Sequence, residues 1–300
     1  MFRLNLRRYL NISSQVQSAV NNGGVVAIES EMLVSGAPYP QNAAFAAAVQ
    51  NEVRKAGAVP AVTAVIDGIM RVGLKDTEVE QLCKKAVPKA SRATLPALIL
   101  QGKTATTTVG SAMLMAVLSG IHVQAAGGIG GVRAENIYDN SADLQELRQS
   151  SVAVFSCGIS PFYSAEATLE YLETYGIPVL GINTKHLPRV YCGSSIALSQ
   201  IVESAQEAAQ TAYLKWNLGL RGGVLSFTES VEGLDASYAQ NAARFAMKSA
   251  EENNINGAAL IQYLAAQMNT LTENKAVAAY KASVLNAVRT AAEASFYMGV

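Results

Sequence analysis

The chain has 300 residues, half of them hydrophobic and 15% charged, which suits one large domain or two small ones with a substantial core. Its 23 basic and 23 acidic residues give a formal net charge of zero, which argues against a broadly basic surface for nucleic acid. The sequence contains no run of about 18 apolar residues, so we expect no transmembrane span and no membrane partner. Three widely spaced cysteines and two histidines leave little material for a disulfide framework, a zinc site or a histidine-based triad, so we expect a reducing, cytoplasmic setting.

The first half of the chain alternates buried strands with helices. Ser13 or Ser14 is the expected cap of the first helix, and Asn42 and Asp76 are the expected caps of two later ones. In chain order the elements are a helix ending near 21, a strand at 25–28, a helix at 43–56, a strand at 59–66 with a hairpin partner at 69–72, helices at 76–84 and 93–101, a hydroxyl-rich loop at 103–108, a helix at 109–119 and a strand at 121–126.

The second half opens on a glycine stretch at 127–131, which leads through a polar loop to a helix that begins at Ser141. The remaining elements in order are a strand at 152–156, a helix at 164–175, a strand at 178–182, a long amphipathic helix at 195–218, a strand at 224–227 and three helical segments after 237. This alternation predicts the α/β class: an α/β/α layered fold with a central, mostly parallel sheet and a helical C-terminal region.

Two acidic residues stand at the end of the strand at 25–28. In an α/β sheet, ligands bind outside the carboxyl ends of the strands. If the chain stays extended, Glu29 and Glu31 point to one face, and paired carboxylates suit general acid–base chemistry. A solvated strand end explains the same two residues equally well.

The glycine stretch suits an anion or sugar phosphate, because a strand end, a glycine turn and a helix N-terminus follow one another. It is not a dinucleotide fingerprint, since Arg133 stands where the third glycine belongs. Asp139 and Asp143 could bind a hard cation such as Mg²⁺ or Mn²⁺, although spacing alone favours Asp143 as an ordinary first-turn acid. Lys89 is a phosphate partner, an imine-forming amine or simply an exposed lysine.

Several longer motifs together resemble the pseudouridine-5′-phosphate glycosidase family. They are Val26-Ala27-Ile28-Glu29-Ser30, Pro38-Tyr39-Pro40-Gln41-Asn42, Lys89-x-Ser91-Arg92, Gly127 to Val132, Asp139-x-Ser141-Ala142-Asp143-Leu144 and Glu170-Tyr171-Leu172-Glu173-Thr174. The resemblance implies one domain over 1–300 that cleaves the carbon–carbon bond between uracil and ribose 5-phosphate. It also implies a small nucleotide or sugar-phosphate partner, a divalent cation, typically Mn²⁺, and a cytoplasmic homotrimer.

The resemblance also assigns roles to single residues. It implies that Glu29 handles protons and that Asp139 binds the metal. It implies substrate contacts for Lys89, Val109, Ser141, Ala142 and Asp143. The family's imine-forming lysine aligns with Ser160, and a C-terminal asparagine of its site aligns weakly with Ala279.

The departure at Ser160 leaves two hypotheses, because serine cannot form an imine. The first is a metal-dependent glycosidase or lyase that cleaves or forms a bond between a nucleobase-like group and ribose 5-phosphate or a related sugar, with an altered substrate or mechanism. In it, Lys89 is the remaining candidate amine, or no imine forms. The second is a non-catalytic nucleotide or sugar-phosphate binding protein of the same fold.

Overall fold

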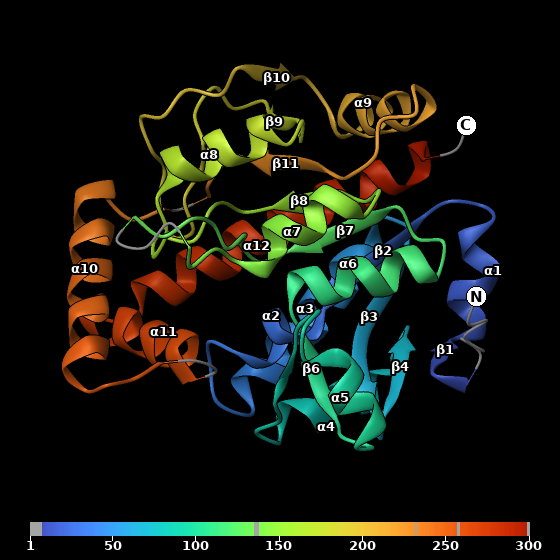
Figure 1. Cartoon of the computed structure of the whole chain (residues 1–300), viewed down its shortest axis with the longest axis horizontal. Helices are drawn as coiled ribbons and strands as arrows, with labels where there is room; N and C mark the ends of the chain where they lie inside the picture. Colours follow the sequence, from blue (N-terminus) through green and yellow to red (C-terminus); the bar gives the residue numbers. More distant parts are fainter. Residues whose placement is uncertain (1–7, 135–137, 232, 257–258, 299–300) are drawn as a thin grey trace.

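A sheet of eleven strands runs through the middle of the protein (Figure 1). The structure is a computed structural model and describes residues 8–134, 138–231, 233–256 and 259–298. The strands are β1 (Leu10–Ile12), β2 (Val25–Glu29), β3 (Val59–Ile66), β4 (Ile69–Val72), β5 (Lys89–Ala90), β6 (Ala105–Thr107), β7 (Val123–Ala126), β8 (Ala153–Ser156), β9 (Val179–Ile182), β10 (Gln200–Val202) and β11 (Val224–Thr228).

The order along the sheet is β1-β4-β3-β2-β7-β8-β11-β9-β10, and β6 pairs with β3 and β5. Neighbours on this path are parallel except β3 and β4, which form the predicted hairpin around Asp67-Gly68. Every residue of β2, β7, β8 and β11 is buried, as expected where helices cover both faces of a parallel sheet.

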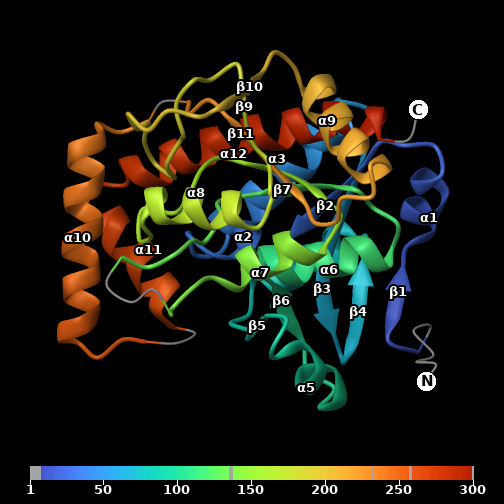
Figure 2. The ribbon, with the colours of Figure 1, turned by 45° about the horizontal axis from the view of Figure 1, so that its top comes forward.

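Helices lie on both faces of this sheet (Figure 2). They are α1 (Ser14–Val20), α2 (Ser30–Val34), α3 (Gln41–Lys55), α4 (Asp76–Cys83), α5 (Leu95–Leu100), α6 (Val109–Leu118), α7 (Ala142–Gln149), α8 (Ala165–Thr174), α9 (Ala205–Asn217), α10 (Ala236–Glu252), α11 (Leu260–Leu271) and α12 (Lys275–Ala294). Side chains of α3, α4, α9 and α12 join one core cluster, and those of α1, α6, α7 and α8 join the other. The α/β class, the layered arrangement and the helical C-terminal region are therefore confirmed.

The alanine-rich α12 packs directly on the sheet, against β7, β8 and β11. Its buried Ala287 and Ala291 are small, so the helix can approach the strands closely. At one end of the molecule α10 and α11 pack on each other and on the start of α12, with Phe162 from the loop after β8 (Figure 1). None of the described helices is long and apolar enough to cross a membrane. The single domain over 1–300 stays a prediction.

The structure corrects the helix predicted at 195–218. Its first part contains β10, which extends the sheet beside β9, and Ser204 then caps the shorter helix α9 with its side chain. Two apolar residues in β10, Ile201 and Val202, fit helical and extended spacing alike over so short a run. Parallel pairing with β9, which only the folded sheet offers, selects the strand.

The condition under which Glu29 and Glu31 would point to one face is not met, because α2 begins at Ser30. Two predicted helix caps are also wrong. Asn42 and Asp76 are not N-caps; these positions belong to Pro40 and Lys75. The side chain of Asn42 instead donates to the carbonyl of Cys83 at 2.9 Å, so a long-range bond competes successfully with local capping.

The hydroxyl-rich segment at 103–108 is not all loop, because it contains β6. Thr107 Oγ1 donates to the carbonyl of Thr63 at 2.8 Å and accepts a bond from the backbone N–H of Ser30 at 3.0 Å. These threonines are buried and satisfied within the protein. The segment therefore ties β6 to the ends of β2 and β3, next to the site described below.

Candidate active site

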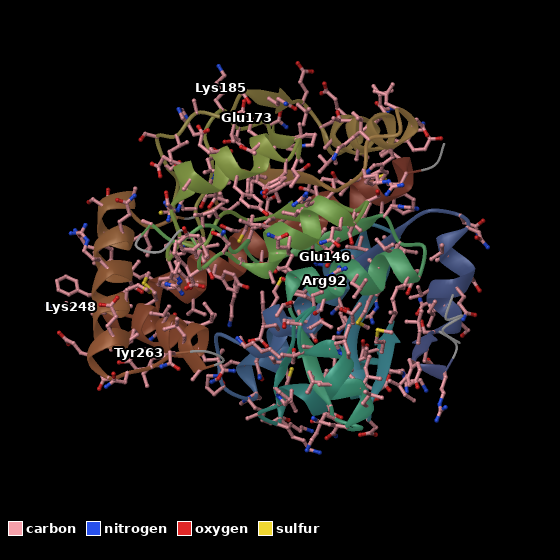
Figure 3. All side chains as sticks on the ribbon, viewed as in Figure 1. Arg92, Glu146, Glu173, Lys185, Lys248 and Tyr263 are labelled. Atoms are coloured by element: carbon pink, nitrogen blue, oxygen red, sulfur yellow. The ribbon has the colours of Figure 1, made fainter. Side chains whose placement is uncertain are left out.

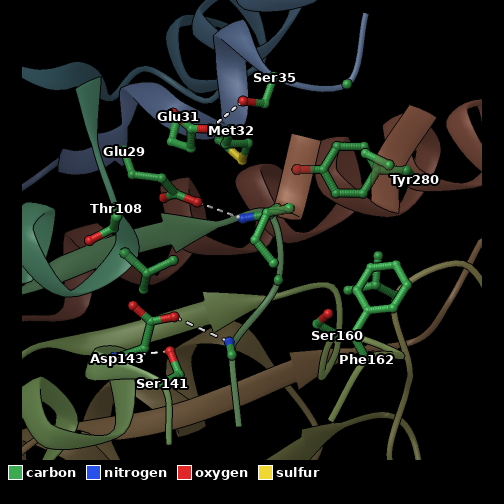
Figure 4. A pocket seen from close by; sticks show the side chains of 18 of the residues that line it. Glu29, Glu31, Met32, Ser35, Thr108, Ser141, Asp143, Ser160, Phe162 and Tyr280 are labelled. Carbon is green, nitrogen blue, oxygen red and sulfur yellow. Dashed lines mark hydrogen bonds between the residues drawn. The ribbon is translucent and has the colours of Figure 1, made fainter. Parts of the chain in front are cut away.

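A pocket of about 410 Å³ opens at the carboxyl ends of the parallel strands, a volume within the range typical of small-molecule sites (Figure 4). Its wall combines the ends of β2 and β7, the N-termini of α6 and α7, the loop after β8 and residues of α11 and α12. Seven residues singled out from the sequence line it: Glu29, Lys89, Val109, Ser141, Ala142, Asp143 and Ser160. The structure thus brings together every predicted catalytic and substrate-contact residue.

Glu29 is the last residue of β2 and is only 3% exposed. Its Oε1 accepts a hydrogen bond from the backbone N–H of Gly127 at 2.9 Å, and its Oε2 is buried without a hydrogen-bond partner among the described residues. Burial raises the pKa of Glu29 to about 8. The carboxyl group therefore keeps its proton at neutral pH, as a general acid requires.

Asp143 lies in the first turn of α7, whose N-cap is Ser141. Its Oδ1 accepts from the N–H of Gly110 at 3.0 Å, and its Oδ2 accepts from the N–H of Gly130 at 3.2 Å. Burial raises the pKa of Asp143, and these two backbone bonds oppose that shift. Both oxygens therefore connect the glycine stretch to the N-terminus of α6. Asp143 is thus an acidic residue in the first turn of a helix, as its spacing suggested, and its carboxylate also faces the pocket (Figure 4).

Lys89 and Glu31 form a salt bridge in the wall of the pocket. The distance from Lys89 Nζ to Glu31 Oε1 is 2.6 Å, and the two side chains are 16% and 15% exposed. Glu31 is also held by the hydroxyl of Ser35 and by Thr106 Oγ1, which donates to its Oε2 at 2.7 Å. Glu31 and Glu29 thus share one pocket although the chain between them turns into a helix.

Ser160 lies in the loop after β8, beside Phe162 (Figure 4). Its backbone N–H donates to the carbonyl of Ile129 at 2.9 Å, and its own carbonyl accepts from Arg189 at 3.4 Å. The backbone at this position is therefore fastened to the glycine stretch. The hydroxyl side chain lines the pocket where the resemblance places a lysine.

Asp139, the predicted metal ligand, does not line the pocket. Its side chain is 59% exposed, and its Oδ2 lies 2.6 Å from Arg133 Nε, an ion pair in which the N–H is not aligned for a hydrogen bond. No group of three His, Cys, Asp or Glu side chains suited to a metal occurs in the described parts of the chain. One exposed carboxylate that already has a guanidinium partner does not fit a resident manganese site by itself. Metal binding by Asp139 stays a prediction.

The sequence reasoning missed Tyr280 and Met32, which line the pocket from α12 and α2. A Cβ placed on Gly127 would lie 2.2 Å from Tyr280 Oη and 2.8 Å from Met32 Cγ. Both side chains therefore pack so closely against the glycine that bonds Glu29 that a side chain at position 127 has no room. Burial raises the pKa of Tyr280 well above its ordinary value. Ala279, the expected counterpart of a site asparagine, is buried and is not in the wall. No sequence pattern marks a single tyrosine in a C-terminal helix as a site residue.

Several known proteins are similar to this chain in sequence and in fold. The family described as Indigoidine synthase A like protein matches residues 15–296. A pseudouridine-5′-phosphate glycosidase of Caldanaerobacter subterraneus subsp. tengcongensis is 40% identical over 96% of both chains, and one of Escherichia coli is 46% identical over 72% of this chain and 71% of its own. The solved prealnumycin C-glycosynthase in complex with ribulose 5-phosphate is 28% identical, with a TM-score of 0.87 over 97% of both chains.

A second solved structure, an indigoidine synthase A-like protein of Thermotoga maritima, is 22% identical and has a TM-score of 0.86 over 96% of this chain and 95% of its own, which supports the fold. The prediction of an enzyme is confirmed by the relatives in sequence, which are glycosidases, and by the C-glycosynthase among the related structures. The chain belongs to the pseudouridine-5′-phosphate glycosidase family, within the indigoidine synthase A-like group.

Proposed function

We propose that the protein cleaves or forms the carbon–carbon glycosidic bond between a nucleobase-like group and ribose 5-phosphate or a related sugar, with Glu29 as the proton-transferring group. The observation that carries this proposal is the Glu29 carboxyl, which is buried in the pocket and held by one bond to Gly127, and whose pKa burial raises to about 8. A carbon–carbon glycosidic bond has no heteroatom leaving group. Cleavage therefore needs an acid that delivers a proton to the carbon of the base.

The chain's own residues support a route without an imine. Ser160 has no amine, and Lys89 is held 2.6 Å from the carboxylate of Glu31. An imine needs an amine that is free to reach the anomeric carbon, and the Nζ of Lys89 is held by Glu31 instead. Neither Ser160 nor Lys89 is therefore expected to form a covalent bond with the sugar.

Without an imine, cleavage of the carbon–carbon glycosidic bond is a hydrolysis, in which one water molecule is consumed. Glu29 gives its proton to the base carbon that carries the sugar, and the bond breaks with its electron pair on that carbon. The positive charge at the anomeric carbon is shared with the ring oxygen of the sugar. Water adds to the anomeric carbon and returns a proton to Glu29. Formation of the bond is the same sequence in reverse.

A divalent cation is a separate part of this proposal. No step above passes through a metal, because Asp139 is exposed and paired with Arg133. A bound Mn²⁺ would supply positive charge beside an anionic substrate. Asp139 would offer it one carboxylate, and the remaining ligands would be water or substrate oxygens. The homotrimer and the cytoplasmic location stay predictions that light scattering and cell fractionation can check.

The test is release of uracil from pseudouridine and from pseudouridine 5′-phosphate, each with Mn²⁺ and with EDTA, followed by chromatography. Uracil from either compound, absent with Glu29→Gln, supports the proposal. Borohydride added during turnover should leave no sugar adduct on Lys89; an adduct there would replace the imine-free route. Measurable binding with no uracil under any condition would favour the non-catalytic binding protein.

A further inference from the structure

Arg189 lies in the loop between β9 and β10 and is only 8% exposed. Its Nη2 donates to the carbonyl of Tyr163 at 2.8 Å and to the carbonyl of Ser160 at 3.4 Å. Its Nε is buried without a hydrogen-bond partner, and no carboxylate in the described ranges forms an ion pair with it. Burial lowers the pKa of Arg189, yet a guanidinium stays protonated in proteins. The loop therefore contains a buried positive charge that these carboxylates do not compensate.

Three other basic residues in or near the pocket wall each have an acidic partner, in contrast to Arg189. The pairs are Lys89 with Glu31 at 2.6 Å, Arg92 with Glu146 at 2.5 Å (Figure 3) and Arg133 with Asp139 at 2.6 Å. A charge that is buried without a partner destabilises a protein strongly, whereas a paired charge costs much less. An anionic ligand in the pocket would supply the negative charge that Arg189 lacks.

The guanidinium group of Arg189 lies directly behind the pocket wall. Ser160 and Tyr163, whose carbonyls it binds, both line the cavity, and so do Val190 and Tyr191, which follow it in the chain. Arg189 itself is not among the described residues that line the cavity, so its charge acts across one layer of the wall. Because the group is buried, its field is screened less than that of a charge on the surface. Its attraction therefore extends to an anion held in the pocket.

From this placement we infer that Arg189 is a positioning residue of the active site, which holds the loop from Ser160 to Tyr163 and whose charge favours a phosphate-bearing ligand over its neutral counterpart. This inference rests on the proposed function and adds a residue to it. The side chain of Ser160 contributes no charge, so the positive charge on this side of the pocket comes from behind the wall. A guanidinium supplies that charge without offering an amine for imine formation, which agrees with the imine-free route.

The experiment compares pseudouridine 5′-phosphate with pseudouridine by calorimetric titration of the wild type, Arg189→Met, Arg189→Lys and Arg71→Met. The wild type should bind the phosphate ester at least about tenfold more tightly. Arg189→Met should reduce this preference by about tenfold, because only the ester loses an attraction. Arg189→Lys keeps the charge but not the fixed fork of donors, so it should weaken both ligands alike and retain the preference. Arg71→Met is the matched control, since Arg71 pairs with Glu78 at 3.0 Å and should leave the preference unchanged.

Two results would overturn this role of Arg189. One is equal affinity of the wild type for the two compounds, and the other is an Arg189→Met variant that weakens both by the same factor, as a purely structural clamp would. If Arg189→Met does not fold, loss of the preference in Arg189→Lys, which keeps the charge, would contradict the inference.

Uracil release separates the inference from the proposed function. A preference for the ester that depends on Arg189, without uracil release, would overturn the proposed function and leave the role of Arg189 in ligand binding. Uracil release with equal affinity for the two compounds would overturn the inference and leave the proposed function standing. Failure of both compounds to bind would overturn both.

Discussion

The backbone N–H of Gly127 donates a 2.9 Å hydrogen bond to Glu29 Oε1 and so connects the ends of two neighbouring strands, β2 and β7. The carbonyl of the same glycine accepts from Cys157 Sγ at 2.7 Å. One hydrogen bond to a buried carboxyl compensates little of the cost of ionising it, which is why its pKa rises to about 8. The position of the candidate acid and its protonation state thus have the same structural origin.

Glu29→Gln should abolish most activity, because glutamine keeps the size and the acceptor for Gly127 but has no transferable proton. We expect a loss of about 10²–10⁴-fold in kcat, the range for a general acid. In the wild type, kcat/KM should be steady to about pH 8 and fall above it as Glu29 of the free enzyme ionises. A steady-state pH profile checks this. An unchanged rate for the variant would remove Glu29 from the mechanism.

The same substitution should stabilise the protein near neutral pH. Glu29 holds its proton up to about pH 8 when folded, whereas its ordinary pKa is 4.5, so between these values the folded state binds more protons and stability falls as pH rises. The free energy of unfolding of the wild type should drop relative to Glu29→Gln by about 1.4 kcal/mol per pH unit in this window. Denaturant titrations at pH 5, 6.5 and 8 measure the difference. If the free energies of unfolding of the wild type and Glu29→Gln changed with pH in the same way, the pKa of Glu29 would not be raised in the folded protein.

Asp143→Ala should destabilise the fold, because it leaves the buried N–H group of Gly110 and the partly buried N–H group of Gly130 without an acceptor. Each unsatisfied group costs about 1–3 kcal/mol, so a loss of about 2–5 kcal/mol is expected by chemical denaturation. Asp76→Ala is the control. Its carboxylate pairs with Arg54 on the surface and should contribute less than about 1 kcal/mol. Equal losses for the two variants would mean that the backbone bonds of Asp143 are unimportant.

Ser160→Lys tests the position that departs from the family. The new amine would enter the pocket wall on a loop that is fastened to Ile129 through the backbone. If the remaining wall still accepts an opened sugar, borohydride should trap an adduct on residue 160, and mass spectrometry of the digest would locate it. The wild type should give no adduct at this position. Absence of an adduct in a folded variant that binds substrate would show that the pocket has diverged beyond the single residue.

Metal dependence has a distinct signature at Asp139. If Mn²⁺ stimulates turnover through this residue, it must compete with Arg133 for the carboxylate. Arg133→Met should then lower the Mn²⁺ concentration for half-maximal stimulation, and Asp139→Asn should abolish the stimulation by Mn²⁺. Activity that survives EDTA and does not respond to Mn²⁺ in any variant would exclude the cation from the proposal. Calorimetric titration of the protein with Mn²⁺ gives a readout that does not depend on turnover.

Local patterns in the sequence determined most of the framework. Apolar runs predicted the central strands, and Ser13 was one of the two serines expected to cap the first helix, as the structure confirms. The order of strands and helices established the layered class. Glu29 and Asp143 were found because they stand at a strand end and in a first helical turn, positions that a linear chain already reveals.

Only the tertiary structure decided which charges meet. Glu31 and Lys89 are 58 positions apart, and nothing in their local sequence indicates that they form a 2.6 Å salt bridge. Tyr280 reaches the pocket because α12 packs across the sheet, and β10 is a strand because β9 offers it an edge. Periodicity reports which face of an element is buried, whereas pairing, desolvation and pKa depend on contacts between elements that the linear order does not contain.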